Sequence, residues 1–303
     1  MLTFRPSRET MGIIFGLTAA LMWSSFLIAS RVGAVDGLLP IDMMVLRFGI
    51  AGLLLAPVLI LSRRRKTHPS LTLRHALFLA LTAGPIFVWL NVGGFQFAPL
   101  AHGAVIQPAT VALAGMGLAA LLLGEVLTRR QVFGAVLLLV GIIAIAGPSV
   151  FVMNTEILIG DAMFVGAGLF WVGYTLLLKR WQISGLRAAA AVSVLSAIVV
   201  LPVAPFVGVA ERLGHLSWGE LFFHATAHGL FNGVGAIVAF GMAVERLGAA
   251  RASLVPAIIP ATTLIIGLPI TGERPTALEF TGAAVACIGL IIALAQRNWY
   301  QRQ

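Results

Sequence analysis

Four polar residues recur at helical spacing inside the apolar stretch 220–242. They are Glu220, His224, His228 and Asn232, each four positions after the one before. This spacing aligns them on one face of an α-helix. A His-x-x-x-His pair can bind zinc, but no third ligand stands at a suitable spacing, so we predict no metal site. We expect the stripe, through His228 and Asn232, to line a substrate cavity; helix–helix hydrogen bonding is the alternative.

Arg47 is the formal charge that lies clearly inside an apolar stretch, 41–61, long enough to cross a bilayer. A charge at membrane depth is costly and usually marks function. Asp42 precedes Arg47 by five residues, whereas four would be ideal for a helical pair. The sequence therefore predicts a substrate-contact or gating role for Arg47. The alternative is a side chain that reaches the nearby outer interface.

Aromatic and amide side chains supply further candidates for substrate contact. Trp23 and Trp171 stand at equivalent positions of two apolar stretches, about twelve residues past their starts, and Tyr174 follows Trp171 by one helical turn. Tryptophans at the membrane interface are the common alternative. The remaining candidates in apolar stretches are Trp89, Asn91 and Gln107. Aromatic faces bury apolar groups and hold cations, and neutral amides hydrogen-bond a carboxylate.

Two prolines and two glutamates recur at matching places. Pro108 and Pro256 lie inside apolar stretches, where a proline frees a backbone carbonyl and can kink the helix. They are predicted hinges, with a static kink as the alternative. Glu125 and Glu273 each follow a glycine and precede a threonine and a new stretch. We expect these carboxylates to cap the start of the following helix, with a coupling role as the alternative.

The composition places these residues in a membrane. Of the 303 residues 59% are hydrophobic and 10% are charged, with a mean hydropathy of +1.01. A soluble chain carries about a quarter charged residues. Lipid as the solvent for the outward side chains removes the conflict. The net charge of +9 is expected from basic cytoplasmic loops, so we predict a lipid bilayer and no nucleic acid as partner.

Ten apolar stretches of near-spanning length follow one another with short connections. They are 11–30, 41–61, 76–98, 103–123, 131–148, 159–178, 188–209, 220–242, 252–271 and 276–295. With a cytoplasmic N-terminus, sixteen of the twenty Lys and Arg residues fall inside, and three fall outside. Basic residues favour the cytoplasmic side, so both termini are predicted to be cytoplasmic in a bacterial-type inner membrane.

The two halves repeat at a constant offset of 148 residues. The matched positions are Trp23/Trp171, Arg31/Lys179, Pro108/Pro256, Glu125/Glu273, Thr128/Thr276, Gly134/Gly282 and Gly141/Gly289. We therefore predict two domains, 1–150 and 151–303, of five helices each. An odd number of helices inserts the second repeat upside down relative to the first. Inverted repeats of this kind carry substrate near the midplane between them.

These paired motifs resemble the EamA-domain family of the drug/metabolite transporter superfamily. The resemblance rests on Ala104-Val-Ile-Gln-Pro-Ala-Thr with Leu123-Gly-Glu-Val-Leu-Thr, and on Ala252-Ser-Leu-Val-Pro-Ala-Ile-Ile-Pro with Gly272-Glu-Arg-Pro-Thr. Leu46-Arg-Phe also looks like the family. Ala112 departs from the pattern, because Pro260 is its counterpart. The resemblance implies a ten-helix metabolite exporter, most similar to exporters of amino acids, including aromatic ones.

The sequence thus predicts an all-α integral membrane protein of ten transmembrane helices that transports a small-molecule substrate by alternating access. Amino acids with apolar or aromatic side chains are the expected substrates. A lipid-linked, nucleotide-sugar or phosphorylated-metabolite translocator is the alternative. No catalytic triad, phosphate loop or nucleotide-binding motif is visible, so we expect neither an enzyme nor a cofactor. We take a monomer as the expectation.

Overall fold

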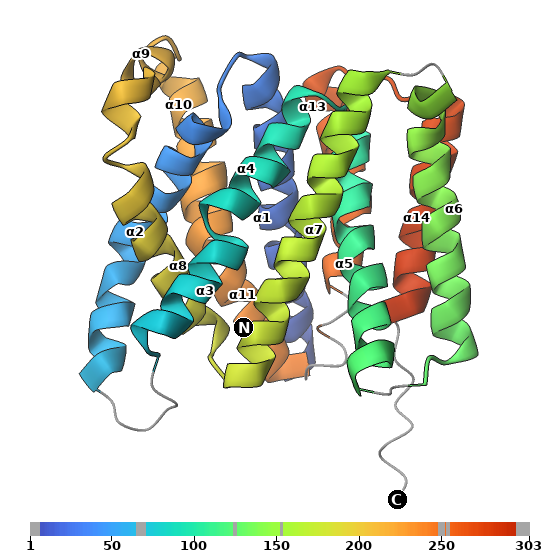
Figure 1. Ribbon diagram of the computed structural model, residues 1–303, viewed down its shortest axis with the longest axis horizontal. Helices are drawn as coiled ribbons and strands as arrows, with labels where there is room; N and C mark the ends of the chain where they lie inside the picture. The colour runs from blue at the N-terminus through green and yellow to red at the C-terminus, as the bar shows by residue number, and fades with distance from the viewer. Residues whose placement is uncertain are drawn as a thin grey trace, which may run out of the picture.

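The computed structural model describes residues 7–64, 71–123, 126–151, 154–247, 252 and 255–294, and within these ranges it contains helices and no strand (Figure 1). The elements are α1 (Arg8–Val35), α2 (Pro40–Arg64), α3 (Leu73–Ala83), α4 (Pro85–Gly93), η1 (Gly94–Gln96), α5 (Leu100–Leu123), α6 (Arg129–Phe151), α7 (Thr155–Trp181), α8 (Gly185–Val200), η2 (Ala204–Val207), α9 (Val209–Gly214), α10 (Trp218–His224), η3 (Ala225–Gly235), α11 (Ala236–Leu247), α13 (Val255–Thr271) and α14 (Ala277–Leu294).

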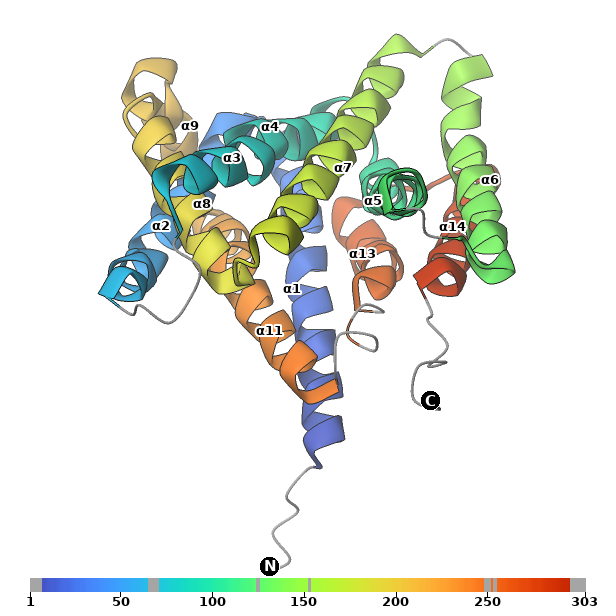
Figure 2. The ribbon, with the colours of Figure 1, turned by 60° about the horizontal axis from the view of Figure 1, so that its bottom comes forward.

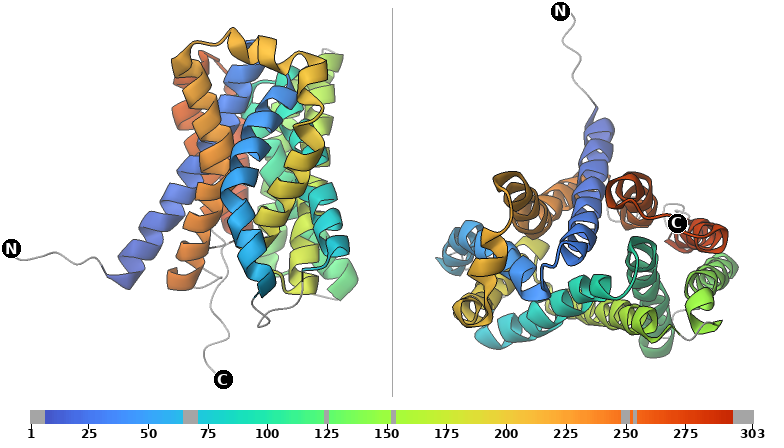
Figure 3. Two further views of the ribbon diagram at one scale, coloured as in Figure 1. Left: turned by 90° about the vertical axis from the view of Figure 1, so that its left-hand side faces the viewer. Right: turned by 90° about the horizontal axis from the view of Figure 1, so that it is seen from above.

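The long helices run side by side and alternate in direction. α1 begins and α14 ends at the same end of the molecule, the lower end in Figure 1 and in the left view of Figure 3. The opposite end collects the last residues of α1 and α13 and the first residues of α2, α5, α7 and α14. We call this the upper end.

Helix length and surface chemistry define a multi-pass membrane protein. Seven helical segments are long and apolar enough to cross a bilayer, and Gly185–Val200 and Val255–Thr271 are shorter apolar helices. Large apolar side chains such as Leu53, Leu121 and Ile265 are exposed. A water-facing surface would not carry so many apolar side chains, whereas lipid accommodates them without cost.

Where the structure describes them, the predicted stretches are mainly helical, but three of them are not continuous α-helices. The stretch 76–98 breaks at Gly84, where Pro85 opens α4. A Cβ at Gly84 would lie 2.2 Å from the Ala80 carbonyl oxygen, so the break requires glycine. The stretch 188–209 leaves the α-helix after Val200, two residues before Pro202. This agrees with the inability of proline to continue a helix.

The third departure is in the stretch 220–242, which the sequence predicts as one α-helix. The structure inserts an eleven-residue π-helix, η3, between α10 and α11. A π-helix is rare, and its usual form, a single-turn bulge inside an α-helix, is frequently found at functional sites. η3 packs closely on α2, because a Cβ at Gly229 would lie 2.8 Å from the Leu46 carbonyl oxygen. Glycine at Gly229 and, four residues on, at Gly233 allows the two backbones to approach, as in other Gly-x-x-x-Gly pairs.

Helices α6 and α14 form an antiparallel pair beside the other helices (Figure 2). Their contacts are reciprocal: a Cβ at Gly141 would lie 2.6 Å from the Gly282 carbonyl oxygen, and one at Gly282 would lie 2.9 Å from that of Gly141. Likewise, a Cβ at Gly289 would lie 2.9 Å from the Gly134 carbonyl oxygen. The Gly141–Gly282 contact thus has a counterpart in the contact between Gly289 and Gly134, which lie 148 residues from Gly141 and Gly282 respectively.

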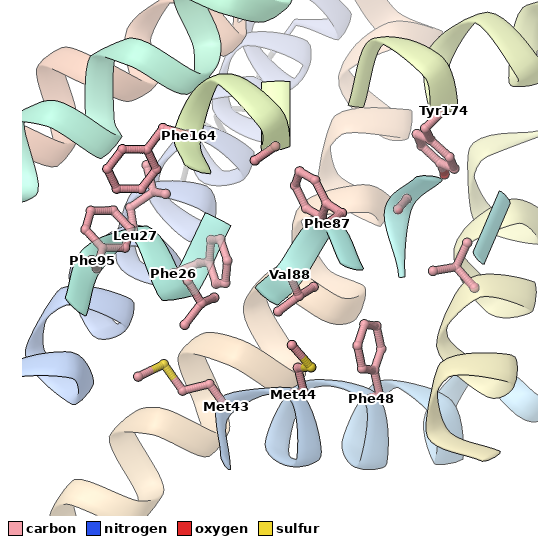
Figure 4. Packing of buried hydrophobic residues seen from close by; sticks show 14 of the residues in the cluster. Phe26, Leu27, Met43, Met44, Phe48, Phe87, Val88, Phe95, Phe164 and Tyr174 are labelled. Atoms are coloured by element: carbon pink, nitrogen blue, oxygen red, sulfur yellow. The ribbon is translucent and has the colours of Figure 1, made fainter. Parts of the chain in front are cut away.

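The largest buried cluster lies where α1, α2, α4 and α7 meet (Figure 4). Met44 and Phe48 of α2 face Val88 and Phe87 of α4 there. Phe26 of α1 and Tyr174 of α7 belong to the same cluster. This cluster surrounds the one charged side chain of the interior of α2 and positions the candidate site.

Candidate functional site

Arg47 lies two turns into α2, partly buried, with its guanidinium over aromatic rings. Its central carbon is 5.4 Å from the ring centre of Phe26 and 5.5 Å from that of Phe48. Cation–π contacts of this kind stabilise a guanidinium that has lost part of its hydration. Among the described residues no carboxylate lies within 4 Å of Arg47 and no hydrogen-bond partner reaches it. The positive charge is therefore not neutralised by the described part of the chain.

Asp42 does not serve as the partner of Arg47. Its two carboxylate oxygens accept hydrogen bonds from Arg212 Nε at 2.7 Å and Arg212 Nη2 at 2.8 Å, and Oδ2 also accepts from the Leu39 backbone N–H at 2.8 Å. These hydrogen bonds to Asp42 raise the pKa of Arg212 above its ordinary value, so this pair stays charged. It fixes the start of α2 to the segment before α10.

A cluster of aromatic side chains lies beside Arg47. Trp171 of α7 lies 5.2 Å from Phe87 and 5.1 Å from Tyr174, ring centre to ring centre. Tyr174 is buried and close enough to Arg47 to interact with its charge. The structure thus brings together two predicted aromatic residues and the predicted cation. Flat rings next to a cation suit a ligand with an apolar body and an anionic group.

Buried polar atoms without a partner lie on the helices around Arg47. His228 and His224 are fully buried and stacked, with ring centres 5.8 Å apart, and His228 meets Phe26 edge-on at 5.4 Å. Under ordinary hydrogen-bond geometry the ring nitrogens of His224 and His228 have no partner, although the Ala29 backbone lies close to the His228 ring. Asn91 Oδ1 and Asn232 Nδ2 likewise have no partner. Buried polar groups are almost always satisfied, so these atoms are sites for water or ligand atoms.

Three predicted substrate residues lie apart from this group. Trp23 packs with Phe240 of α11 at 5.5 Å, in a small cluster that includes Val255. Trp89 of α4 is 54% exposed. Gln107 is partly buried on α5, in a segment that packs against Gly168 of α7. The arrangement therefore centres on Arg47, Trp171 and Tyr174.

The two predicted hinge prolines and the two predicted capping glutamates lie in different surroundings. Pro108 lies inside α5, which stays helical through it, whereas Pro256 lies in the first described turn of α13. Glu125 lies outside the described residues. The prediction that Glu273 caps the helix after it is wrong. Glu279 and Thr276 form that capping pair, because Glu279 Oε2 accepts from the Thr276 backbone N–H at 2.7 Å.

Glu273 instead joins segments that are remote in sequence. Its Oε1 accepts from Arg31 Nε of α1 at 2.5 Å, and its Oε2 accepts from the backbone N–H of Leu100 at 2.8 Å. It therefore caps α5 rather than α14, where a negative charge also opposes the positive end of the helix dipole. Arg31 in turn donates to the Phe95 carbonyl oxygen at 2.6 Å.

A second polar cluster at the upper end escaped the sequence analysis. The ring of His102 on α5 lies between Asp161 of α7 and Glu279 of α14. Asp161 is only the third residue of the apolar stretch 159–178, so the rule that selected Arg47, a charge at membrane depth, does not find it. All the ion pairs among the described residues, including Arg31–Glu273 and Asp42–Arg212, lie at this end.

Among the described residues, a cavity of about 640 Å³ lies away from Arg47, between α2 and α8. Its lining is apolar and it opens outward, as expected for a groove filled by lipid tails. The residues that line it include Gly49, Gly52, Ile198 and Leu201, and none of the predicted site residues.

Charged and unsatisfied polar groups inside a multi-pass helical protein mark functional sites such as substrate or ion pathways. Residues 10–147 and 158–295 each match the EamA-like transporter family. The chain therefore belongs to that family and is a multi-pass membrane transporter. It is 26% identical to a protein named Uncharacterized inner membrane transporter YhbE of Escherichia coli (strain K12), over 95% of this chain and 92% of the relative.

The chain is also similar to two further proteins. Uncharacterized transporter YyaM of Bacillus subtilis (strain 168) is 23% identical over 82% of each chain. A crystal structure at 17% identity covers 95% of this chain and 99% of its own, with a TM-score of 0.61. That likeness concerns the fold alone.

Proposed function

We propose that this transporter exports amino acids with apolar or aromatic side chains across a bacterial-type inner membrane. The observation that carries the proposal is Arg47, a cation without a carboxylate partner among the described residues, placed beside aromatic rings. An unpaired, partly buried charge is costly, and a substrate carboxylate would neutralise it. The apolar side chain of the substrate would then lie on Trp171 and Tyr174.

The same geometry favours a zwitterion over a phosphorylated metabolite. One guanidinium balances one carboxylate, whereas a phosphate dianion would bring an excess negative charge into the site. The α-ammonium group of an amino acid would meet aromatic faces and the free Asn91 Oδ1, which accepts a hydrogen bond. Aromatic contacts discriminate little between similar apolar groups, so we expect broad selectivity among such amino acids.

The transport step we propose is alternating access between two inverted five-helix repeats, 1–150 and 151–303, in a monomer with ten spans and both termini cytoplasmic. Two observations support the repeats: the family match recurs at the offset of 148 residues, and the α6–α14 glycine contacts are reciprocal. The upper end would then face outward, and its ion pairs would hold that end closed. The upper end would open when the two repeats exchange their conformations.

Uptake by purified protein in proteoliposomes tests the substrate class. The panel contains labelled apolar and aromatic amino acids, phosphorylated sugars and a nucleotide-sugar. We expect exchange of the amino acids alone. Exchange of a phosphorylated compound without any amino acid would contradict the proposal and favour the alternative translocator. Trp171→Ala should weaken the apparent affinity by about 1 kcal/mol or more, roughly fivefold.

A further inference from the structure

His102 is a buried histidine held between two carboxylates from other helices. Its side chain is fully buried at the third residue of α5. Nδ1 lies 2.7 Å from Asp161 Oδ1 on α7, and Nε2 lies 3.5 Å from Glu279 Oε1 on α14. α5 belongs to the first family match of the chain, and α7 and α14 belong to the second. The contact therefore joins the two halves of the molecule.

The geometry can hold one proton more than the usual charge states supply. A neutral imidazole carries one N–H and one bare nitrogen, and an ionised carboxylate only accepts. With two ionised carboxylates, one ring nitrogen would face an acceptor without a hydrogen between them. Both contacts become hydrogen bonds only if His102 is an imidazolium or if one carboxylate is protonated. Asp161 Oδ2 is also buried without a partner, on a residue that is 7% exposed.

No neighbouring charged group among the described residues takes the place of this additional proton. His102 is the only titratable residue within Leu100–Leu123. Arg31 on α1 is engaged by Glu273, and Glu273 is held in addition by the N-terminus of α5. On α7 and before α14, Glu156 and Arg274 are exposed. Among the described residues, no cation other than His102 itself pairs with Asp161 or Glu279.

We propose that His102, Asp161 and Glu279 bind one exchangeable proton that stabilises the closed upper end and drives the transport cycle. The proton comes as hydronium from the outer water while the upper end is open and occupies the bare ring nitrogen or a carboxylate oxygen. It returns to the inner water after the upper end has closed. A site that binds a proton more tightly in one conformation shifts the population toward that conformation. The driving role rests on the proposed function, whereas the proton site itself does not.

The first test needs no substrate. Spin labels are placed at the exposed positions Phe97, before α5, and Leu278 on α14, in a Cys287→Ala background. Their separation is measured by double electron–electron resonance between about pH 5 and about pH 9, the range that spans histidine titration. We expect the short-distance population at low pH and a population about 5 Å longer at high pH. His102→Gln and Asp161→Asn should each remove the pH response, and the exposed His215→Gln should retain it.

The second test measures coupling in proteoliposomes with an acidic interior. For one-to-one exchange, a gradient of one pH unit drives amino-acid accumulation of up to about tenfold. In His102→Gln the ratio of gradient-driven uptake to counterflow should fall to the value measured without a pH gradient. In His215→Gln it should stay unchanged.

A distance distribution that does not change with pH, or that changes equally in His102→Gln, overturns the proton site. If no amino acid exchanges but the distances respond to pH, the proposed function fails and the proton site stands. If amino acids exchange without gradient-driven accumulation, the driving role fails.

Discussion

Glu273 shows at the scale of one residue how this protein holds its upper end together. Its carboxylate binds Arg31 of α1 and the N-terminus of α5 at once. Glu273→Gln replaces one acceptor oxygen by an N–H group that faces donors. We expect it to lower the free energy of unfolding by about 1–3 kcal/mol. Thermal unfolding in detergent measures this, with the exposed Glu211→Gln as control. Unchanged stability with abolished transport would instead assign Glu273 a coupling role.

Arg47 should behave in the opposite way. Its guanidinium has aromatic contacts but no carboxylate among the described residues, so its charge stabilises the fold little. Arg47→Met should leave the melting temperature unchanged or raise it, because an unpaired, partly buried charge disappears. Arg47→Lys should weaken the apparent substrate affinity about tenfold or more, because lysine lacks the planar fork that binds a carboxylate. A marked loss of thermal stability in Arg47→Met would show that Arg47 is structural.

At the scale of elements, η3 and α2 depend on close backbone approach. Gly229→Ala would place a methyl group 2.6 Å from Ile50 Cδ1 and 2.8 Å from the Leu46 carbonyl oxygen. We expect a loss of about 1–3 kcal/mol from overpacking. Gly241→Ala on α11 is the matched control, because nothing lies within 4 Å of the added carbon. It should be neutral or slightly stabilising, as alanine favours helix. Equal stability of the two variants in thermal unfolding would contradict this packing.

The sequence predicted the helical stretches because bilayer thickness sets their length. The stretch 76–98 was predicted as one helix, so the break at Gly84 before Pro85 was missed. Nothing in the i, i+4 spacing of His224 and His228 distinguishes a π-helix from an α-helix. The partners of Glu273 lie 242 and 173 residues away, so no local rule finds them. Arg47 was found by its charge at depth, whereas its aromatic surroundings required the three-dimensional packing.

At the scale of the whole molecule, the proposed topology makes a direct prediction. A reporter enzyme fused after Gln303 should behave as cytoplasmic, and one inserted at 154–156 should behave as external. The physical reason is the excess of Lys and Arg in the segments assigned to the inside. Alkaline phosphatase and green fluorescent protein activities report the two sides. The reverse pattern would also place the upper-end ion pairs in the cytoplasm and overturn the proposed outer closure.

The central claim is that Arg47 selects the carboxylate of an amino acid with an apolar or aromatic side chain. The most direct measurement is counterflow of labelled phenylalanine in proteoliposomes, with competition by unlabelled phenylalanine or by phenethylamine, which lacks the carboxylate. In the wild type, phenylalanine should compete at least about tenfold better, since a charge-assisted contact contributes about 1.5–3 kcal/mol. Arg47→Gln should remove most of that preference. Equal competition by the two compounds in the wild type, or an undiminished preference in Arg47→Gln, would contradict the account.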